Sequence, residues 1–164
     1  DVPGWVALCM VLVLGSYERY YGIPGLLEDA IRPEFHQMAR QYWNDYVYDA
    51  ERMQSFPGPQ GLLVPGFFAP GTAQANRLFM EHARRNSAAG WRYDSPIRFC
   101  IGLADEATHP DMTTPVIAAN PGFAHGVLVA GANHRTTFLA GLYGGPGVLQ
   151  GQPNALAWFD AVVA

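Results

Sequence analysis

The chain has 164 residues, of which 49% are hydrophobic, 13% aromatic and 15% charged. This is the composition of a globular protein that is long enough to bury a core. The formal net charge is −4, and no basic cluster is interleaved with aromatic side chains, which excludes the electrostatic footprint of a nucleic-acid-binding protein. No nucleic-acid partner is therefore expected.

The first predicted element is a helix over residues 3–21, capped by Asp1. Residues 5–14 are wholly apolar, but these ten residues are about half of what a membrane span needs. They also lack the positive segment that precedes the apolar part of a signal peptide. We therefore expect no membrane span and a helix buried against a sheet. A chain that begins inside such a helix is expected to be processed or excised, with its first part elsewhere.

The two cysteines, Cys9 and Cys100, both lie inside apolar runs. Free cysteines in such runs pack as small hydrophobic side chains. We expect two buried thiols, and nothing in the sequence supports a disulfide between them.

Glycine and proline divide the next part of the chain into short pieces. A helical turn is predicted over 26–31 and a longer helix over about 34–48. Residues 55–71 are rich in proline and glycine and predict a long irregular connection, which in compact domains is usually a lid or a linker. An amphipathic helix follows over 73–88, with Thr72 as its cap.

The pattern changes after Pro96. Residues 97–101 and 127–130 form two short apolar runs that predict buried strands, and a helix is predicted between them over 110–119. Two further helices, over 135–142 and 153–163, close the chain. Strands that alternate with helices through short loops indicate an α/β fold with parallel pairing. Because two strands do not make a doubly covered sheet, we expect partner strands from a missing part.

A carboxylate and an imidazole follow the two predicted strands. Asp105 comes shortly after the first strand and His134 after the second. Since reactive side chains gather beyond the carboxyl ends of parallel strands, Asp105 is expected to bond one ring nitrogen of His134 and to orient it. Two alternatives stay open: Asp105 acts only as a turn residue, or Glu106 takes its place as the acid. His134 is also compatible with a helix-start histidine bonded to nearby backbone.

At these residues the chain resembles the α/β-hydrolase family. The stretch Gly-Leu-Ala-Asp-Glu at 102–106 is similar to that family's acid loop, and Gly-Ala-Asn-His at 131–134 is similar to its histidine loop. The resemblance implies the C-terminal part of a mostly parallel α/β-hydrolase sheet, namely its last two strands. It also implies a core helix over 1–21, a cap or lid over 22–72 and the C-terminal core over 73–164.

The family's nucleophile is missing from this chain. No G-x-S-x-G motif occurs, and none of Ser16, Ser55, Ser87 and Ser95 lies in that context. The resemblance implies that the nucleophile and the oxyanion hole lie in an N-terminal half, present as a separate or cleaved chain. This half is the expected partner, as a heterodimer or a processed protein.

Aromatic side chains are concentrated in the expected cap. Tyr42, Trp43 and Tyr46 are candidate substrate-binding residues, and Phe67 with Phe68 is the expected exposed apolar pair. Such side chains hold an apolar acyl or aromatic group. Plain core packing is the alternative for this cluster.

The expected activity is hydrolysis of carboxylic esters by the serine mechanism, with a small apolar ester or acyl substrate. Rival readings are a peptidase, an acyltransferase, a dehalogenase-like or epoxide-hydrolase-like enzyme, and a non-catalytic binding protein of the same fold. No cofactor is expected, because phosphate-binding, dinucleotide-binding and zinc-site spacings are absent from the sequence.

Overall fold

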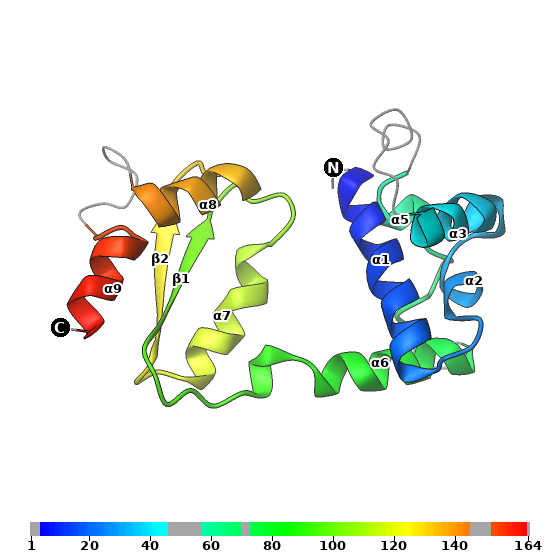
Figure 1. The fold of residues 1–164 in the computed structure, drawn as a ribbon, viewed down its shortest axis with the longest axis horizontal. Coiled ribbons are helices and arrows are strands. Elements are labelled where there is room, and N and C mark those ends of the chain that lie inside the picture. Colours follow the sequence, from blue (N-terminus) through cyan, green and yellow to red (C-terminus); the bar gives the residue numbers. More distant parts are fainter. Residues whose placement is uncertain (1–3, 46–56, 70–72, 145–151, 164) are drawn as a thin grey trace. The chain divides into compact units, whose positions relative to one another are not determined.

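The computed structural model describes residues 4–45, 57–69, 73–144 and 152–163. The chain forms two compact units, Asp1–Asn86 and Ser87–Ala164. The first is helical in its described part and the second is mixed α/β with a two-stranded parallel sheet (Figure 1). Among the described helices none has the length and apolar character that crossing a bilayer requires. The predicted division into core helix, cap and hydrolase core stays a prediction.

The N-terminal unit is built around helix α1 (Gly4–Tyr21). Its remaining helices are α2 (Leu26–Ala30), the 3-10 turn η1 (Pro33–Phe35), α3 (His36–Asp45), α5 (Pro59–Leu62) and α6 (Gln74–Arg85). α1 contacts α2, α3 and α5, and α6 packs on α2. The core partners of α1 in this unit are helices, so the expected burial of α1 against a sheet stays a prediction. Its buried residues are Ala7, Leu8, Val11, Leu14 and Gly15.

An ion-pair network joins three of these helices. Arg40 of α3 contacts Glu18 of α1 at 2.7 Å and Glu28 of α2 at 2.5 Å. The hydrogen bond from Arg40 lowers the pKa of Glu28, although burial of that carboxyl acts in the opposite direction. Glu18 also accepts the backbone N–H of Leu27 at 2.9 Å. The network therefore fixes the start of α2 against α1 and α3.

The described part of the proline- and glycine-rich segment, residues 57–69, contains more regular structure than its composition predicts. Its described part contains the short helix α5, and Leu63 forms an antiparallel bridge with Ile31. Phe67 is only 2% exposed and belongs to the core, whereas Phe68 is 60% exposed. The expectation of an exposed Phe67–Phe68 pair is thus wrong for Phe67 and confirmed for Phe68, because the segment folds back and packs Leu62, Leu63 and Phe67 into the core.

Both thiols are free, and neither matches the expectation of full burial. Cys9 is exposed and Cys100 is partly buried. The thiol of Cys9 is exposed because α1 buries one stripe of its surface rather than its whole circumference.

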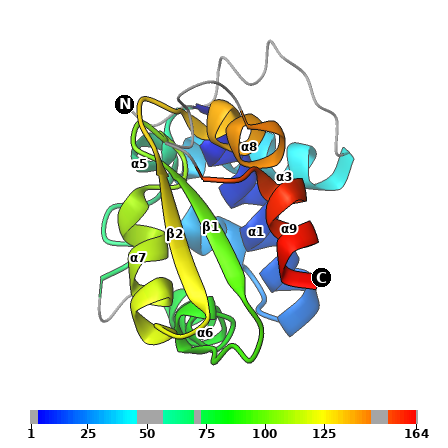
Figure 2. The same cartoon turned by 90° about the vertical axis from the view of Figure 1, so that its left-hand side faces the viewer.

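The C-terminal unit contains β1 (Ile97–Gly102) and β2 (Ala124–Val129), which pair in parallel, as predicted. Helix α7 (Pro110–Ala119) connects them, and α8 (His134–Tyr143) and α9 (Ala155–Val163) follow β2. A 3-10 turn, η2 (Ala88–Gly90), precedes β1. β2 begins three residues before its predicted start, where Ala124 pairs with Ile97. Figure 2 shows the two strands side by side with α7 on one side and α9 on the other.

Alternate residues of β1 face different helices. A Cβ on Gly141 of α8 would meet the Cys100 sulfur at 3.0 Å, and one on Gly126 would meet side chains of Ile117 in α7 and of Ile101. α7 and α8 therefore cover opposite faces of the sheet. Gly102 tightens this packing at the end of β1, since an added Cβ would collide with Thr137 of α8.

Phe67 and Phe68 are a matched pair for testing the N-terminal core. We expect Phe67→Ala to lower the free energy of unfolding of this unit by about 3–5 kcal/mol, because it leaves a cavity in a packed core. Phe68→Ala is expected to cost about 1 kcal/mol or less, through its edge contact with Phe67. Urea unfolding followed through the amide signals of α1 and α6 measures both, and equal losses would contradict the assigned core.

Candidate active site

Asp105 and His134 are brought together by the loops that leave the two strands. Asp105 lies three residues beyond the end of β1, and His134 is the first residue of α8 after β2. The backbone N–H of Ala104 donates to the carbonyl of Ala132 at 3.0 Å and joins the two loops. The sheet and this bond place the carboxylate and the imidazole at the same edge, as the sequence predicts.

The carboxylate of Asp105 faces one nitrogen of the His134 ring. Nδ1 of His134 lies 3.2 Å from both Oδ1 and Oδ2 of Asp105. The Asp105 side chain is 6% exposed, whereas that of His134 is 47% exposed. A shielded carboxylate thus contacts a ring that is reachable from outside. These are the positions that an acid needs in order to fix the tautomer of a histidine and to stabilise its charged form.

Backbone groups hold the Asp105 carboxylate in place. Oδ1 accepts the N–H of Thr108 at 2.7 Å and the N–H of Ala107 at 2.9 Å. Burial raises the pKa of Asp105, but these two hydrogen bonds, together with the hydrogen bond and the charge of His134, outweigh it and lower the pKa below its usual value. Asp105 therefore acts as a turn residue and contacts the histidine at the same time, so the two readings do not exclude each other.

His134 is anchored through its backbone as well. Asn133 and Thr136 form a reciprocal capping box at the start of α8. Glu106 accepts the backbone N–H of His134 at 3.2 Å, which places a negative charge at the helix N-terminus. Asp105, and not Glu106, lies at the ring nitrogen. The first turn of α8 therefore sets the position from which the imidazole projects.

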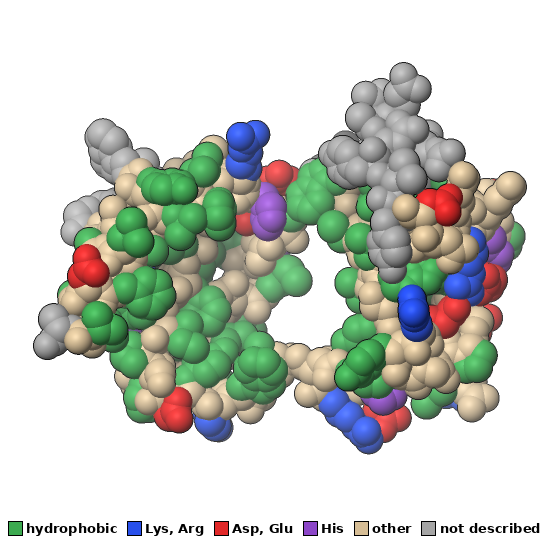
Figure 3. Space-filling view, viewed as in Figure 1, with side chains coloured by type: hydrophobic (Ala, Val, Ile, Leu, Met, Phe, Trp, Pro, Cys, Tyr) green, Lys and Arg blue, Asp and Glu red, His purple; other side chains and the backbone are tan. Residues whose placement is uncertain are grey.

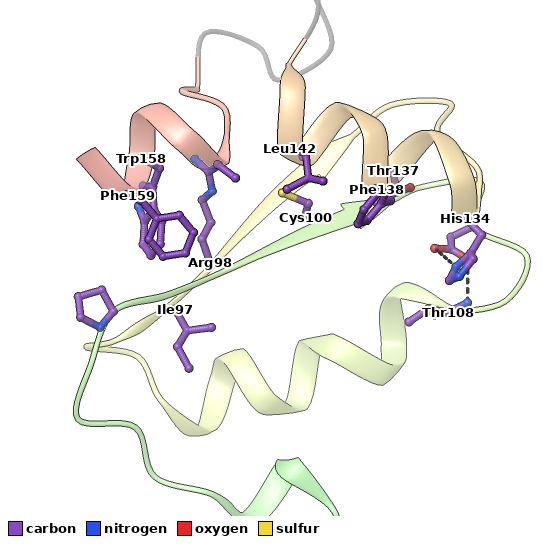
Figure 4. Close-up of a pocket in the computed structure, with 14 residues that line it drawn as sticks. Ile97, Arg98, Cys100, Thr108, His134, Thr137, Phe138, Leu142, Trp158 and Phe159 are labelled. Carbon is purple, nitrogen blue, oxygen red and sulfur yellow. Dashed lines mark hydrogen bonds and ion pairs between the residues drawn. The ribbon is translucent and has the colours of Figure 1, made fainter. Parts of the chain in front are cut away.

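An apolar groove of about 610 Å³ begins at this pair and was missed by sequence reasoning. Phe138 and Leu142 of α8 line it together with Trp158 and Phe159 of α9 (Figure 4). The signal in the sequence is the spacing of His134, Phe138 and Leu142, which puts them on one face of a helix. Trp158 and Phe159 line the groove because α9 packs on α8, and this packing could not be predicted from the local sequence pattern.

The predicted substrate-binding residues belong to the other unit. Tyr42 and Trp43 are partly buried against the N-terminal core, and the Trp43 ring lies over Gly15. Phe67 is buried in that core and lines a pocket together with Phe68, so its role as a substrate-binding residue stays a prediction. Phe68 is exposed, and Tyr46 lies outside the described residues.

The remaining titratable side chains form no metal site in the part of the chain that the structure describes, where no group of three or more His, Cys, Asp or Glu residues is placed to hold an ion. His109 and His125 are exposed, as expected. His36 contacts the carbonyl of Ile31 at 2.7 Å and His82 stacks on Tyr21.

The lowered pKa of Asp105 predicts a pH-dependent contribution to stability. This contribution is present in full above the usual aspartate pKa of about 4 and is lost as the pH falls through the lower pKa of the folded state. Asp105→Asn should therefore lower the free energy of unfolding of the C-terminal unit near neutral pH, and the difference from the parent chain should shrink towards pH of about 2. Urea unfolding followed through the β1 and β2 amide signals measures it.

Asp94→Asn is the matched control, because Asp94 is exposed and accepts a hydrogen bond from the adjacent Ser95 hydroxyl. A loss for Asp105→Asn that stays constant down to the acid limit would contradict the stabilised carboxylate.

Comparisons with known proteins assign the chain to no family. No protein-family model matches the chain, and no curated protein and no solved structure is significantly similar to it.

Proposed function

We propose that the C-terminal unit supplies the acid and the histidine of a serine hydrolase of the α/β-hydrolase type, which acts on carboxylic esters with a small apolar acyl group. The observation that carries the proposal is the contact of His134 Nδ1 with both oxygens of Asp105 at 3.2 Å. The shielding of the carboxylate and the exposure of the ring add support, because a general base must reach its substrate while its orienting acid stays fixed.

In the proposed reaction His134 takes the hydroxyl proton of a serine through Nε2 as the serine oxygen attacks the ester carbonyl. Asp105 stabilises the imidazolium that forms. The imidazolium then gives its proton to the leaving alkoxide, and water hydrolyses the acyl-serine by the same route. In this scheme the apolar groove beside His134 contacts the acyl group of the ester.

The serine in this proposal comes from another polypeptide segment. Ser95 precedes β1 whereas Asp105 follows it, and the six residues of β1 span roughly 20 Å. Ser87 lies further upstream, where its hydroxyl oxygen accepts the N–H of Ala89. Ser16 lies in α1 of the N-terminal unit, and Ser55 lies outside the described residues. Because no serine of this chain lies in a G-x-S-x-G motif, the proposal places the nucleophile and the oxyanion hole in an N-terminal half.

Substitution of the histidine tests the proposal in the intact assembly. We expect His134→Ala to reduce the hydrolysis of an activated acetate ester by about 10³-fold or more, because the serine loses its base. His125→Ala is the matched control, since His125 is an exposed histidine of β2 in the same unit, and it should retain full turnover. Unchanged activity of His134→Ala, with the fold intact, would exclude the proposed role.

Labelling with a fluorophosphonate tests the origin of the nucleophile. The proposal expects the label on a serine of the partner segment and its loss in His134→Ala. A label on Ser16, Ser55, Ser87 or Ser95 would contradict it.

A further inference from the structure

A second cavity lies on the C-terminal unit and is not lined by the acid–histidine pair. It has a volume of about 600 Å³, and neither Asp105 nor His134 contributes to its walls. Arg98 and Trp158 line both this cavity and the groove beside His134. The remaining lining residues are His125, Gly126, Val127, Leu128 and Gln152, none of which is acidic. We refer to this space as the Arg98 cavity.

The strand pairing provides no acidic neighbour for Arg98. Cys100, two residues further along β1, packs towards Gly141 of α8, and alternate residues of a strand share one face of the sheet. Arg98 therefore projects from the face that α8 covers. Its register partner on β2 is His125. Opposite charges on facing residues often stabilise paired strands, but here no carboxylate faces the guanidinium across the pair.

Two contacts hold the guanidinium of Arg98 in place. It donates to the carbonyl of Pro153 at 2.6 Å and lies 5.4 Å from the centre of the Trp158 ring. Figure 4 shows the side chain rising from β1 beside Trp158 of α9. A guanidinium carries several N–H groups, and those that do not bond to Pro153 have no acceptor among the described residues. Arg98 is thus a positioned donor with unused N–H groups.

The charge of Arg98 is not balanced by an ion pair within the described part of the chain. Arg40, in contrast, contacts both Glu18 and Glu28. Arg98 is partly buried, and hydrophobic side chains predominate on the visible face of this unit, over α8 and α9 (Figure 3). A positive charge with reduced access to water is stabilised by an anion that accepts its hydrogen bonds.

We propose that the Arg98 cavity binds a small aromatic carboxylate. The planar guanidinium matches a carboxylate, which accepts two parallel N–H bonds from it. The ring of the ligand packs on the apolar surface of Trp158, Val127 and Leu128. The volume of the cavity is in the usual range of small-ligand sites, about 300–1,000 Å³. The proposal does not require His134 to be catalytic.

The charge and the lining of the cavity favour this class of ligand over two others. Arg98 is the one permanently charged residue among those that line the cavity, and a single charge matches a carboxylate better than a phosphate dianion. A neutral aromatic compound contacts the same apolar surface but leaves the N–H groups of Arg98 without a charged acceptor.

Benzoate is the probe for this site, and benzamide, which has the same ring without the charge, is its control. NMR spectra of the full chain report on the Nε–H group of Arg98 and on the indole N–H of Trp158. We expect benzoate to shift both signals in a saturable way and benzamide to bind at least about tenfold more weakly. Inorganic phosphate at the same ionic strength should cause no saturable shift. Equal affinity for phosphate would contradict the assignment to an aromatic carboxylate.

Two arginines of the C-terminal unit give a matched pair of variants. Arg92 also donates to a backbone carbonyl, that of Ala119, but it is exposed and lines neither the groove nor the Arg98 cavity. We expect Arg98→Gln to weaken benzoate binding by about tenfold or more and Arg92→Gln to leave it unchanged. Arg98→Lys keeps the charge but loses the planar fork, so its affinity should lie between those of the parent chain and Arg98→Gln. Unchanged amide signals of α9 show that this helix has kept its place in each variant.

Four results would overturn the proposal, and none of them depends on ester hydrolysis. The first is the absence of a saturable shift by benzoate in the parent chain. The second is equal binding of benzamide, which would leave an apolar pocket without an anion site. The third is an equal loss in Arg98→Gln and Arg92→Gln, which would indicate unspecific charge attraction. The fourth is a benzoate shift at the ring of His134 with none at Arg98, which would place the anion at the imidazole.

Discussion

The arrangement of the C-terminal unit depends on one carboxylate. Asp105 is held by the backbone N–H groups of Ala107 and Thr108 and faces Nδ1 of His134. A carboxylate that accepts such bonds stays ionised and keeps one orientation. The acid loop, the start of α8 and the direction of the imidazole are therefore fixed together. This contact also explains how one edge of a small sheet presents an exposed histidine whose ring is held in one orientation.

Much of the C-terminal unit could be predicted because its signals are local. The strand β1 and the helix α7 are bounded by glycine, proline and apolar runs, and the parallel pairing that joins Asp105 to His134 follows from their order. The first half of β2 was missed, since Ala124, His125 and Gly126 are weak strand formers that pair only because β1 offers an edge. The exposure of Phe67 was predicted wrongly. Its burial depends on contacts with residues distant in the sequence, and the neighbouring proline and glycine residues do not indicate such contacts.

The same sheet imposes a second constraint on the molecule. A parallel sheet of two strands leaves an edge on each side, and such sheets are stable when covered and extended. In the described part of the chain the open edge of β1 and the apolar side chains of α8 and α9 meet in one groove that ends at His134. The open strand edge, the apolar side chains and the exposed imidazole therefore lie on one part of the C-terminal unit.

The tautomer of His134 is the most direct test of the central claim. Nitrogen NMR of the neutral imidazole distinguishes a proton on Nδ1 from one on Nε2. The account predicts the Nδ1–H form in the parent chain, held by Asp105, and a loss of this preference in Asp105→Asn. A dominant Nε2–H form in the parent chain would contradict the claim that Asp105 orients this histidine as a base.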